Sequence, residues 1–287
     1  HADEALCMDW AGSGAGFELP VPVLAQAKPR SGCPAGLLMP WWATLSLDWS
    51  RRTAGQVMSQ GLEVPWGRRA ATLFWRGSDT GCLLPGGCAA PSAPGPTVCS
   101  CSDWNLHTWP RFPRAKLALL SATYRAVDAK FTKDSVHAEC RPAYLQSDLH
   151  VDQLVPPSGH LEYKYLMYVD GSSFSDRMYW LLLTGAVVMR QTSQLQVWLD
   201  PGLRPHAHFL PVQEDLGDLV DVLEWARGHD LECEGIAAEA RRFARSELSL
   251  DASLFYIHRL LGAYAGLFGP RGAEGRPPAA RPPPPNV

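Results

Sequence analysis

The sequence predicts an α/β protein with Rossmann-like layers around a parallel sheet, and two observations carry this prediction. First, residues 164–189 read as strand, helix and strand, because an apolar run, a helical segment ended by Gly185 and a second apolar run follow one another. Such a βαβ unit implies parallel strands. Second, Arg76 and Arg177 each follow the end of a predicted strand, which is where α/β sheets bind ligands.

The N-terminal part of the chain, residues 1–70, reads as short strands separated by loops. Residues 5–8 and 20–25 are apolar and predict two strands. Residues 37–49 are rich in tryptophan and predict a packed loop. Its tryptophans either stack on a sugar or pack in the core, and the core explains at least two of the three more simply.

Residues 82–110 form a segment rich in Gly, Pro, Ser and Cys, without periodicity, which predicts a surface insertion. The chain has eight cysteines, and four of them lie between Cys82 and Cys101. They could pair as disulfides in a secretory lumen, or remain thiols or bind a metal in a reducing compartment. Because Cys99 and Cys101 lack the two-residue gap usual for zinc, the spacing favours disulfides or thiols, and we predict no metal site.

After this insertion, predicted helices alternate with predicted strands. Residues 116–127, 216–226 and 236–245 have apolar side chains at helical spacing. Residues 251–268 predict a last long helix with one apolar side. From there, residues 269–287 are rich in Pro, Gly and Arg, so we expect a disordered tail with polyproline II bias.

Composition narrows the classes of partner. The 287 residues, 46% hydrophobic and 19% charged, suffice for one large domain or two ordinary ones. The net charge of −3 gives no reason to expect nucleic acid or an anionic membrane as partner. No apolar run approaches the roughly 20 residues that span a bilayer. Because the chain begins with His1 and no leader opens it, we expect a fragment or processed form.

The two strand-end arginines predict a phosphate site. After the strand of residues 163–169, Ser175 can cap a helix of residues 176–184, which places Arg177 in the first turn beside free amides. Such a corner suits a phosphate. Arg177 could instead pair with Asp176 or Asp170 on the surface. Ser175 could equally make only a turn bond.

The second arginine lies in Arg76-Gly77-Ser78, where a β-prone run breaks at glycine. Two arginines can neutralise a diphosphate, and the chain contains no Asp-x-Asp sequence of the kind that metal-dependent sugar transferases display. Lys164 could add a third cation or simply extend to solvent. Ser78 could donate to phosphate or hold the turn.

Five short motifs occur in the order found in one family. They are Arg76-Gly77-Ser78, residues 128–132, Tyr163-Lys164-Tyr165, Gly171 with Ser175 and Arg177, and residues 208–212 followed by Asp215-Leu216. In these motifs the chain resembles the luminal protein O-glucosyltransferases and capsule-associated xylosyltransferases, grouped as glycosyltransferase family 90. It departs from them at Asp79, where the animal O-glucosyltransferases have arginine.

The resemblance implies a GT-B-like fold of two facing Rossmann-like domains. Residues 1–70 would be the remainder of an incomplete acceptor-side domain, and residues 71–250 the nucleotide-sugar domain. Asp9, which precedes a strand like the family's catalytic aspartate, would be the base, and His208 would line the nucleotide pocket.

The implied activity is inverting, metal-independent transfer of glucose or xylose from a UDP-sugar to a hydroxyl of a protein or glycan, in the endoplasmic reticulum or Golgi lumen. The donor is a substrate, and no cofactor is expected. The alternative is a catalytically inactive carbohydrate- or nucleotide-binding protein of the same fold.

Overall fold

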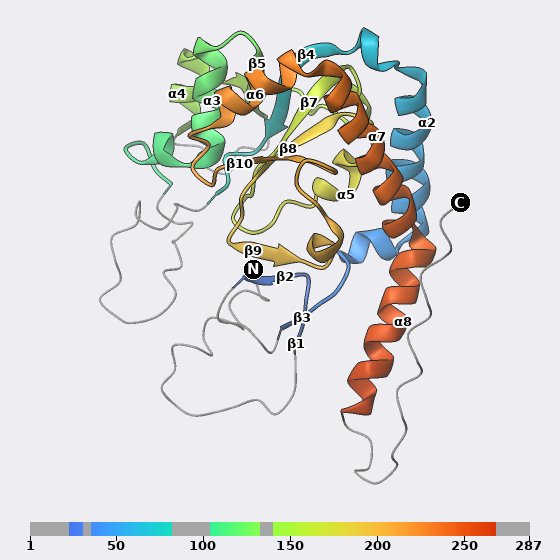
Figure 1. The fold of residues 1–287 in the computed structure, drawn as a ribbon. Coiled ribbons are helices and arrows are strands. Elements are labelled where there is room, and N and C mark those ends of the chain that lie inside the picture. The colour runs from blue at the N-terminus through green and yellow to red at the C-terminus, as the bar shows by residue number, and fades with distance from the viewer. Residues whose placement is uncertain (1–22, 31–35, 82–103, 133–139, 268–287) are drawn as a thin grey trace, which may run out of the picture.

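The computed structural model describes residues 23–30, 36–81, 104–132 and 140–267. Its centre is a six-stranded sheet in which all neighbouring strands are parallel (Figure 1). The strands follow the order β10, β8, β7, β4, β5, β6. Their bounds are Ala70–Gly77 for β4, Val127–Thr132 for β5, His150–Val151 for β6, Tyr163–Tyr168 for β7, Val187–Gln191 for β8 and Leu210–Val212 for β10. The predicted α/β class and the predicted βαβ unit are confirmed.

The order of the strands reverses between β4 and β7. From β4 the chain builds outward through β5 to β6, and then returns to β7 on the other side of β4 and builds outward through β8 to β10. In open α/β sheets, ligands bind outside the carboxyl ends of the strands at such a reversal. The fold therefore points to the ends of β4 and β7 before any side chain is considered.

Buried side chains on both faces of the sheet make this a three-layer protein. Alternate residues of the central strands β4, β7 and β8 enter different clusters; in β7, Tyr165 and Met167 point to one, Leu166 and Tyr168 to the other. The first cluster is covered by α3 (Pro113–Thr123), α4 (Arg141–Gln146) and α6 (Leu219–Gly228). The second includes α5 (Met178–Leu181), and α7 (Asp230–Glu247) contributes to both.

The N-terminal elements pack against the second cluster. β1 (Val23–Ala25) pairs with β3 (Gly36–Leu38), and β2 (Ala27–Pro29) pairs with β9 (Leu195–Val197) from the other side of the predicted boundary at residue 70. The domain boundary itself stays a prediction. The predicted strand at residues 5–8 lies outside the described residues.

The predicted packed loop at residues 37–49 contains β3 and a 3₁₀ turn, Trp42–Leu45. A helix that was not predicted follows: a π-helical segment, Trp49–Ala54, which continues into α2 (Gly55–Glu63). Trp49 is buried, and the ring of Trp41 stacks on that of Tyr179 with 5.8 Å between centroids. Trp42 is 66% exposed and its ring lies 5.7 Å from that of Trp41, centroid to centroid, so the core accounts for two of the three tryptophans.

Two sequence predictions need correction here. The helix expected at residues 116–127 starts at Pro113 and ends at Thr123, because the apolar residues that follow belong to β5. The insertion expected at residues 82–110 is not superficial at its end, since Trp104 and Trp109 are buried in the first cluster. Residues 82–103 lie outside the described part of the chain.

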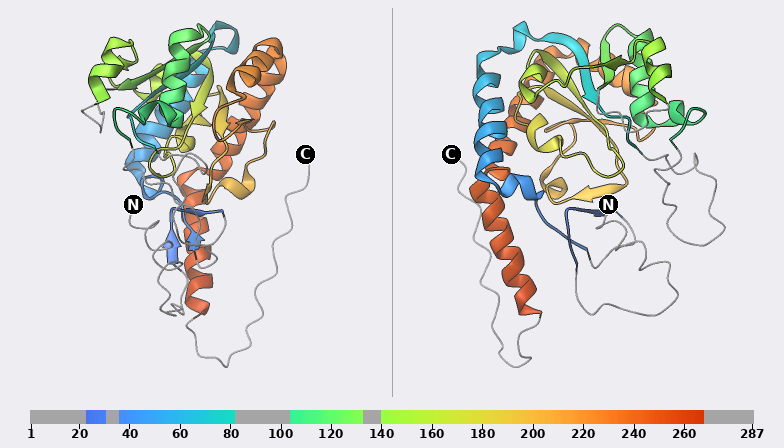
Figure 2. Two further views of the ribbon diagram at one scale, coloured as in Figure 1. Left: turned by 90° about the vertical axis from the view of Figure 1, so that its left-hand side faces the viewer. Right: turned by 180° about the vertical axis from the view of Figure 1, so that it is seen from behind.

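The last helix, α8 (Leu250–Gly266), confirms the prediction of a long C-terminal helix and extends away from the sheet (Figures 1 and 2). Ser249 caps it by accepting a hydrogen bond from the amide of Ala252. Several large apolar side chains of α8 are exposed, among them Phe255 at 67%. None of the described helices is long and apolar enough to cross a bilayer. The predicted tail at residues 269–287 lies outside the described residues.

Candidate functional site

A hollow of about 270 Å³ lies at the carboxyl ends of β4 and β5, beside the segment that follows β7. We call it the switch-point hollow. Its cationic residues are Arg76 and Arg177, the two arginines predicted from sequence to share a site. The remaining lining residues are Ser78, Thr132, Leu154, Val155, Pro157, His160, Asp176 and Trp180.

Arg76 is held firmly at the end of β4. Its guanidinium makes a two-pronged ion pair with Asp128 on β5, with nitrogen–oxygen distances of 2.8 and 3.0 Å, and also donates to the carbonyl of Asp128 at 3.0 Å. It lies 4.3 Å from the centroid of the Phe74 ring. Because Asp128 offsets much of its charge, Arg76 shapes the hollow more than it supplies free positive charge.

Arg177 is the more available cation. Its guanidinium donates to the main-chain carbonyl of Arg76, which joins the two strand ends directly. No ion pair with a carboxylate forms at Arg177 within the described residues, and its ring partner is Trp75, 5.9 Å from guanidinium carbon to ring centroid. Burial lowers the pKa of Arg177 below its ordinary value, and the neighbouring Asp176 opposes this shift. A partly desolvated guanidinium gains most from an anion that enters the hollow.

The helix after β7 is shorter than the sequence predicts. α5 begins at Met178, with Arg177 as the residue before it, and no side chain caps it. The predicted cap, Ser175, is buried, and its main-chain amide donates to the hydroxyl of Tyr168 at 3.2 Å. Ser175 therefore anchors the loop that carries Arg177 rather than lining the hollow.

Gly77 and Ser78 form the turn at the end of β4. A Cβ atom on Gly77 would lie 2.4 Å from the indole carbon Cζ2 of the buried Trp75, so only glycine fits. The hydroxyl of Ser78 lines the hollow, 3.4 Å from that of Thr80. Ser78 is thus placed to donate to a ligand, as one of its two sequence interpretations expects.

The prediction that Lys164 and His208 belong to the nucleotide site needs correction, because neither residue lines the switch-point hollow. Lys164 is at the amino end of β7, where its ammonium pairs with Asp230 at 2.6 Å and lies over the Trp66 ring. His208 lies just before β10; its ring stacks on Phe243 with 4.7 Å between centroids. Both positions are near the starts of strands, whereas the hollow is at their ends.

Arg114, at the start of α3, is a site-building residue that the sequence analysis missed. It is buried, and its guanidinium reaches both strand ends: it donates to Ser78 O at 3.1 Å, to the hydroxyl of Thr80 at 2.5 Å and to Asp170 O at 2.9 Å. Burial, and then the charge of Arg177, lower the pKa of Arg114 to about 9, so it stays charged near neutrality. Its only sequence signal is an arginine directly after the helix-starting Pro113.

Replacing Arg114 with lysine is expected to lower the free energy of unfolding by about 2 kcal/mol, because an ammonium cannot span the same set of acceptors and leaves buried carbonyls unpaired. Urea denaturation measures this change. Arg125→Lys is the matched control, since Arg125 is exposed. Equal denaturation midpoints for Arg114→Lys and the parent protein would contradict the role given to Arg114.

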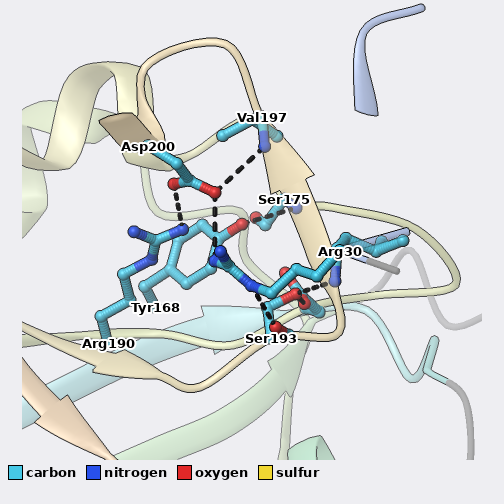
Figure 3. Close-up of polar contacts among 9 residues, drawn as sticks. Arg30, Tyr168, Ser175, Arg190, Ser193, Val197 and Asp200 are labelled. Atoms are coloured by element: carbon cyan, nitrogen blue, oxygen red, sulfur yellow. Dashed lines mark hydrogen bonds and ion pairs between the residues drawn. The ribbon is translucent and has the colours of Figure 1, made fainter. Parts of the chain in front are cut away.

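A buried ion cluster supports the site from the side of β8. The carboxylate of Asp200 pairs with Arg190 at 2.5 Å and with Arg30 at 3.2 Å, and accepts from the amide of Val197 at 3.1 Å. Arg30 also donates to the carbonyl of Ser193 at 2.8 Å. Figure 3 shows how these side chains converge from β8, β9 and the segment after β2.

This cluster continues to the loop that carries Arg177. The hydroxyl of Ser193 donates to Asp170, directly after β7, and the guanidinium of Arg190 lies 5.6 Å from the centroid of the Tyr168 ring. Tyr168 in turn accepts from the Ser175 amide, as seen in Figure 3. The loop between β7 and α5 is therefore fixed by buried polar contacts at both of its sides.

His160 forms an aromatic wall of the switch-point hollow. Its ring lies edge-on between Phe74 and Trp180, with centroid distances of 5.0 and 4.8 Å, and its Nδ1 is 3.1 Å from the carbonyl of Pro156. Burial lowers its pKa to about 4, with a smaller contribution from the nearby charges of Arg177 and Arg76. His160 is consequently neutral near pH 7 and leaves the positive charge of the hollow to the arginines.

The pKa of His160 predicts an acid-sensitive stability. The unfolded state binds a proton near 6.5 and the folded state only near 4, so stability falls as the pH drops through that window, by about 3 kcal/mol in total. His160→Gln should remove this contribution. Free energies of unfolding near pH 7 and near pH 4, for both proteins, measure it. A parent and a variant with the same pH dependence would contradict it.

Two sequence predictions, the catalytic base and the state of most of the cysteines, concern residues outside the described part of the chain. Asp9, the predicted base, lies outside the described residues. Six of the eight cysteines do so as well, while Cys140 and Cys233 are buried. Within the described part of the chain, no three histidine, cysteine, aspartate or glutamate side chains gather closely enough to bind a metal ion.

Comparison with known proteins agrees with the motifs. Protein O-glucosyltransferase 2 of Danio rerio is 36% identical over 106 residues, which cover 37% of this chain and 21% of that protein. Protein O-glucosyltransferase 1 of Homo sapiens is 25% identical over 205 residues, covering 70% of this chain and 43% of that protein. The chain thus spans less than half the length of these relatives.

Among solved structures, HepE of Anabaena in complex with UDP and glucose aligns over 84% of this chain and 63% of its own, with 9% identity and a TM-score of 0.48. That similarity is below the level that establishes a shared fold. The two-domain GT-B arrangement therefore remains an expectation.

The decisive match is to a family profile. Glycosyl transferase family 90 matches residues 110–273, more than half of the chain. This stretch includes Arg114, the βαβ unit and Arg177. With the motif order and the placement of the strand-end arginines, the match shows that this chain belongs to glycosyltransferase family 90.

Proposed function

We propose that this chain binds a UDP-sugar and transfers its sugar, glucose or xylose, to a hydroxyl of a protein or glycan. The observation that carries the proposal is that Arg76 and Arg177 line one hollow at the reversal of strand order. The names of the related O-glucosyltransferases support glucose as donor sugar and a protein as acceptor.

The chemistry follows from the charges in the hollow. When the bond between sugar and UDP breaks, negative charge grows on the departing diphosphate and must be stabilised. Arg177 supplies a partly desolvated guanidinium for this purpose, and Arg76 and Ser78 complete the polar wall. We propose that these groups act without a metal ion, as the lack of Asp-x-Asp in the sequence favours.

We propose that Asp9 draws the proton from the acceptor hydroxyl, which then attacks the sugar from the face opposite UDP and inverts the anomeric centre. Asp9→Asn should slow transfer roughly a hundredfold, since general-base catalysis contributes at least that much. Binding of the UDP-sugar should be unchanged, as measured by calorimetry. A variant with normal turnover would remove Asp9 from the mechanism.

The direct test of the proposed function is release of UDP from a panel of UDP-sugars, with and without acceptor proteins, by the full-length protein. Release from UDP-glucose or UDP-xylose supports it. Binding of UDP without release from any donor would favour the second candidate, an inactive carbohydrate- or nucleotide-binding protein.

Asp79, where the chain departs from the animal enzymes, is the specific observation behind that second candidate. Asp79 is fully buried and is not among the residues that line the switch-point hollow, which argues against a direct contact between Asp79 and the donor sugar. We also propose a secretory-lumen location, endoplasmic reticulum or Golgi, from the family resemblance. Protease protection of the full-length protein in sealed microsomes tests it.

A further inference from the structure

A second and larger hollow, of about 730 Å³, lies on the opposite edge of the sheet from the switch-point hollow. It runs between the end of α2 and one face of α7, and its base is formed by Arg69 and Gly185, which precede β4 and β8. We call it the arginine groove, after Arg69, Arg241 and Arg245. We propose that it binds a phosphate monoester with an apolar body.

Arg69 is the buried cation at the base of the arginine groove, only 6% exposed. Its guanidinium donates to three main-chain carbonyls: Gly61 at 3.1 Å, Val64 at 3.2 Å and Thr184 at 2.9 Å. Its Nη1 is buried and has no hydrogen-bond partner within the described residues. All of these acceptors are neutral carbonyl groups. They satisfy the guanidinium of Arg69 by hydrogen bonds but do not neutralise its positive charge.

Arg241 brings a second guanidinium to the same place. It extends from α7 and donates to the carbonyl of Met58 on α2 at 2.5 Å, while its Nε is buried and unpartnered within the part of the chain that the structure describes. A Cβ atom on Gly185 would lie 3.2 Å from Arg241 Nη1 and 3.4 Å from Arg69 Nη2. The two guanidinium groups therefore converge on one glycine. Because they carry like charges, each destabilises the charged form of the other.

The pKa of Arg69 agrees with this crowding of positive charge. Burial, followed by the charge of Arg241, lowers it to about 10, and burial with the charge of Arg245 lowers the pKa of Arg241. Arg245, one turn beyond Arg241, is exposed at the rim. None of the three has an ion pair with a carboxylate among the described residues. Glu234 lines the groove two turns of α7 before Arg241.

The charge and the walls together define the ligand. Three cations without counter-ions favour a dianion, and arginine forks fit phosphate oxygens in a two-pronged manner. Much of the lining is apolar: Leu62, Val64, Pro65 and Trp66 lie at or just after the end of α2, and Ala238 lies on α7 beside the arginines. A phosphate monoester with an apolar or aromatic body matches both parts, whereas a free phosphate ion leaves the wall unused.

The groove is separate from the proposed transfer chemistry. It lies at the amino ends of strands, while Arg76 and Arg177 lie at the carboxyl ends. α2 and α7, its two sides, are joined where Arg241 donates to the carbonyl of Met58. A ligand in the arginine groove would contact both α2 and α7, which each contribute residues to the second core cluster.

Calorimetric titration of the full chain with phenyl phosphate, inorganic phosphate and benzoate tests the proposal. Phenyl phosphate is expected to bind most tightly. Arg241→Gln and Arg245→Gln should each weaken its binding roughly tenfold to a hundredfold, the loss of charge-assisted hydrogen bonds. Arg245 is exposed, so its variant folds even if loss of the Arg241–Met58 contact disturbs α2.

Two control variants locate the binding. Arg259→Gln, on an exposed position of α8, and Arg177→Gln, in the switch-point hollow, should both leave phenyl phosphate affinity unchanged. Loss of binding in Arg177→Gln alone would place the ligand in the other hollow and overturn the proposal. Benzoate or inorganic phosphate binding as tightly as phenyl phosphate would overturn the assigned ligand class, and absence of phenyl phosphate binding would overturn the site.

Discussion

Arg177→Gln is expected to slow transfer from a UDP-sugar about a thousandfold, the upper range for one preorganised group that meets developing negative charge. Glutamine keeps a donor for the Arg76 carbonyl but removes the cation. The guanidinium is partly desolvated, and no carboxylate pairs with it among the described residues, so its charge acts at nearly full strength on a diphosphate.

The rate of UDP release at low donor concentration measures this effect as kcat/KM, and thermal unfolding checks that the variant is folded. Arg177→Lys should recover part of the rate, since it restores charge without the planar fork. Arg125→Gln, at an exposed position, should behave like the parent protein. A rate for Arg177→Gln close to that of the parent would show that the switch-point hollow is not where the diphosphate leaves.

Asp200→Ala is expected to lower the free energy of unfolding by about 4 kcal/mol, because it removes one partner from a buried ion pair. The side chains of Asp200 and Arg190 are 5% and 8% exposed, and their atoms are 2.5 Å apart. Without the carboxylate, Arg190 and the amide of Val197 would both lose their acceptor.

Urea denaturation monitored by tryptophan fluorescence measures this loss. Asp48→Ala is the matched control, because Asp48 also pairs with an arginine, at 2.8 Å from Arg52, but both side chains are more than two thirds exposed, at 71% and 79%. Its effect should be below about 1 kcal/mol, as is usual for surface pairs. Similar losses in the two variants would mean that burial of the Asp200 cluster does not matter for stability.

Local sequence patterns are sufficient to predict the strands that frame the switch-point hollow and its two arginines. The apolar runs of β7 and β8 and the glycine between them predicted parallel strands, and the positions of Arg76 and Arg177 at strand ends predicted that they would meet. Both inferences depend only on side-chain periodicity and on the rule that parallel strands end at one edge.

The errors have physical causes as well. Lys164 is a candidate phosphate ligand from sequence, but it is the second residue of its strand, and the start of a parallel strand faces the edge opposite the site. Ser175 has the chemistry of a helix cap, but the loop is held by Tyr168 instead and the helix starts later. Arg114 could not be found from sequence, because its bonds join segments far apart in the chain.

The reversal of strand order also governs when the hollow can exist. Arg76 and Arg177 are 101 positions apart, and their contact requires β4 to lie beside β7. Contacts between such distant segments close late, after a long loop has been ordered. During synthesis, residues up to Arg76 would leave the ribosome with only one of the two arginines of the switch-point hollow, so a ligand of this hollow cannot guide the early collapse and can only stabilise a sheet that has already been assembled.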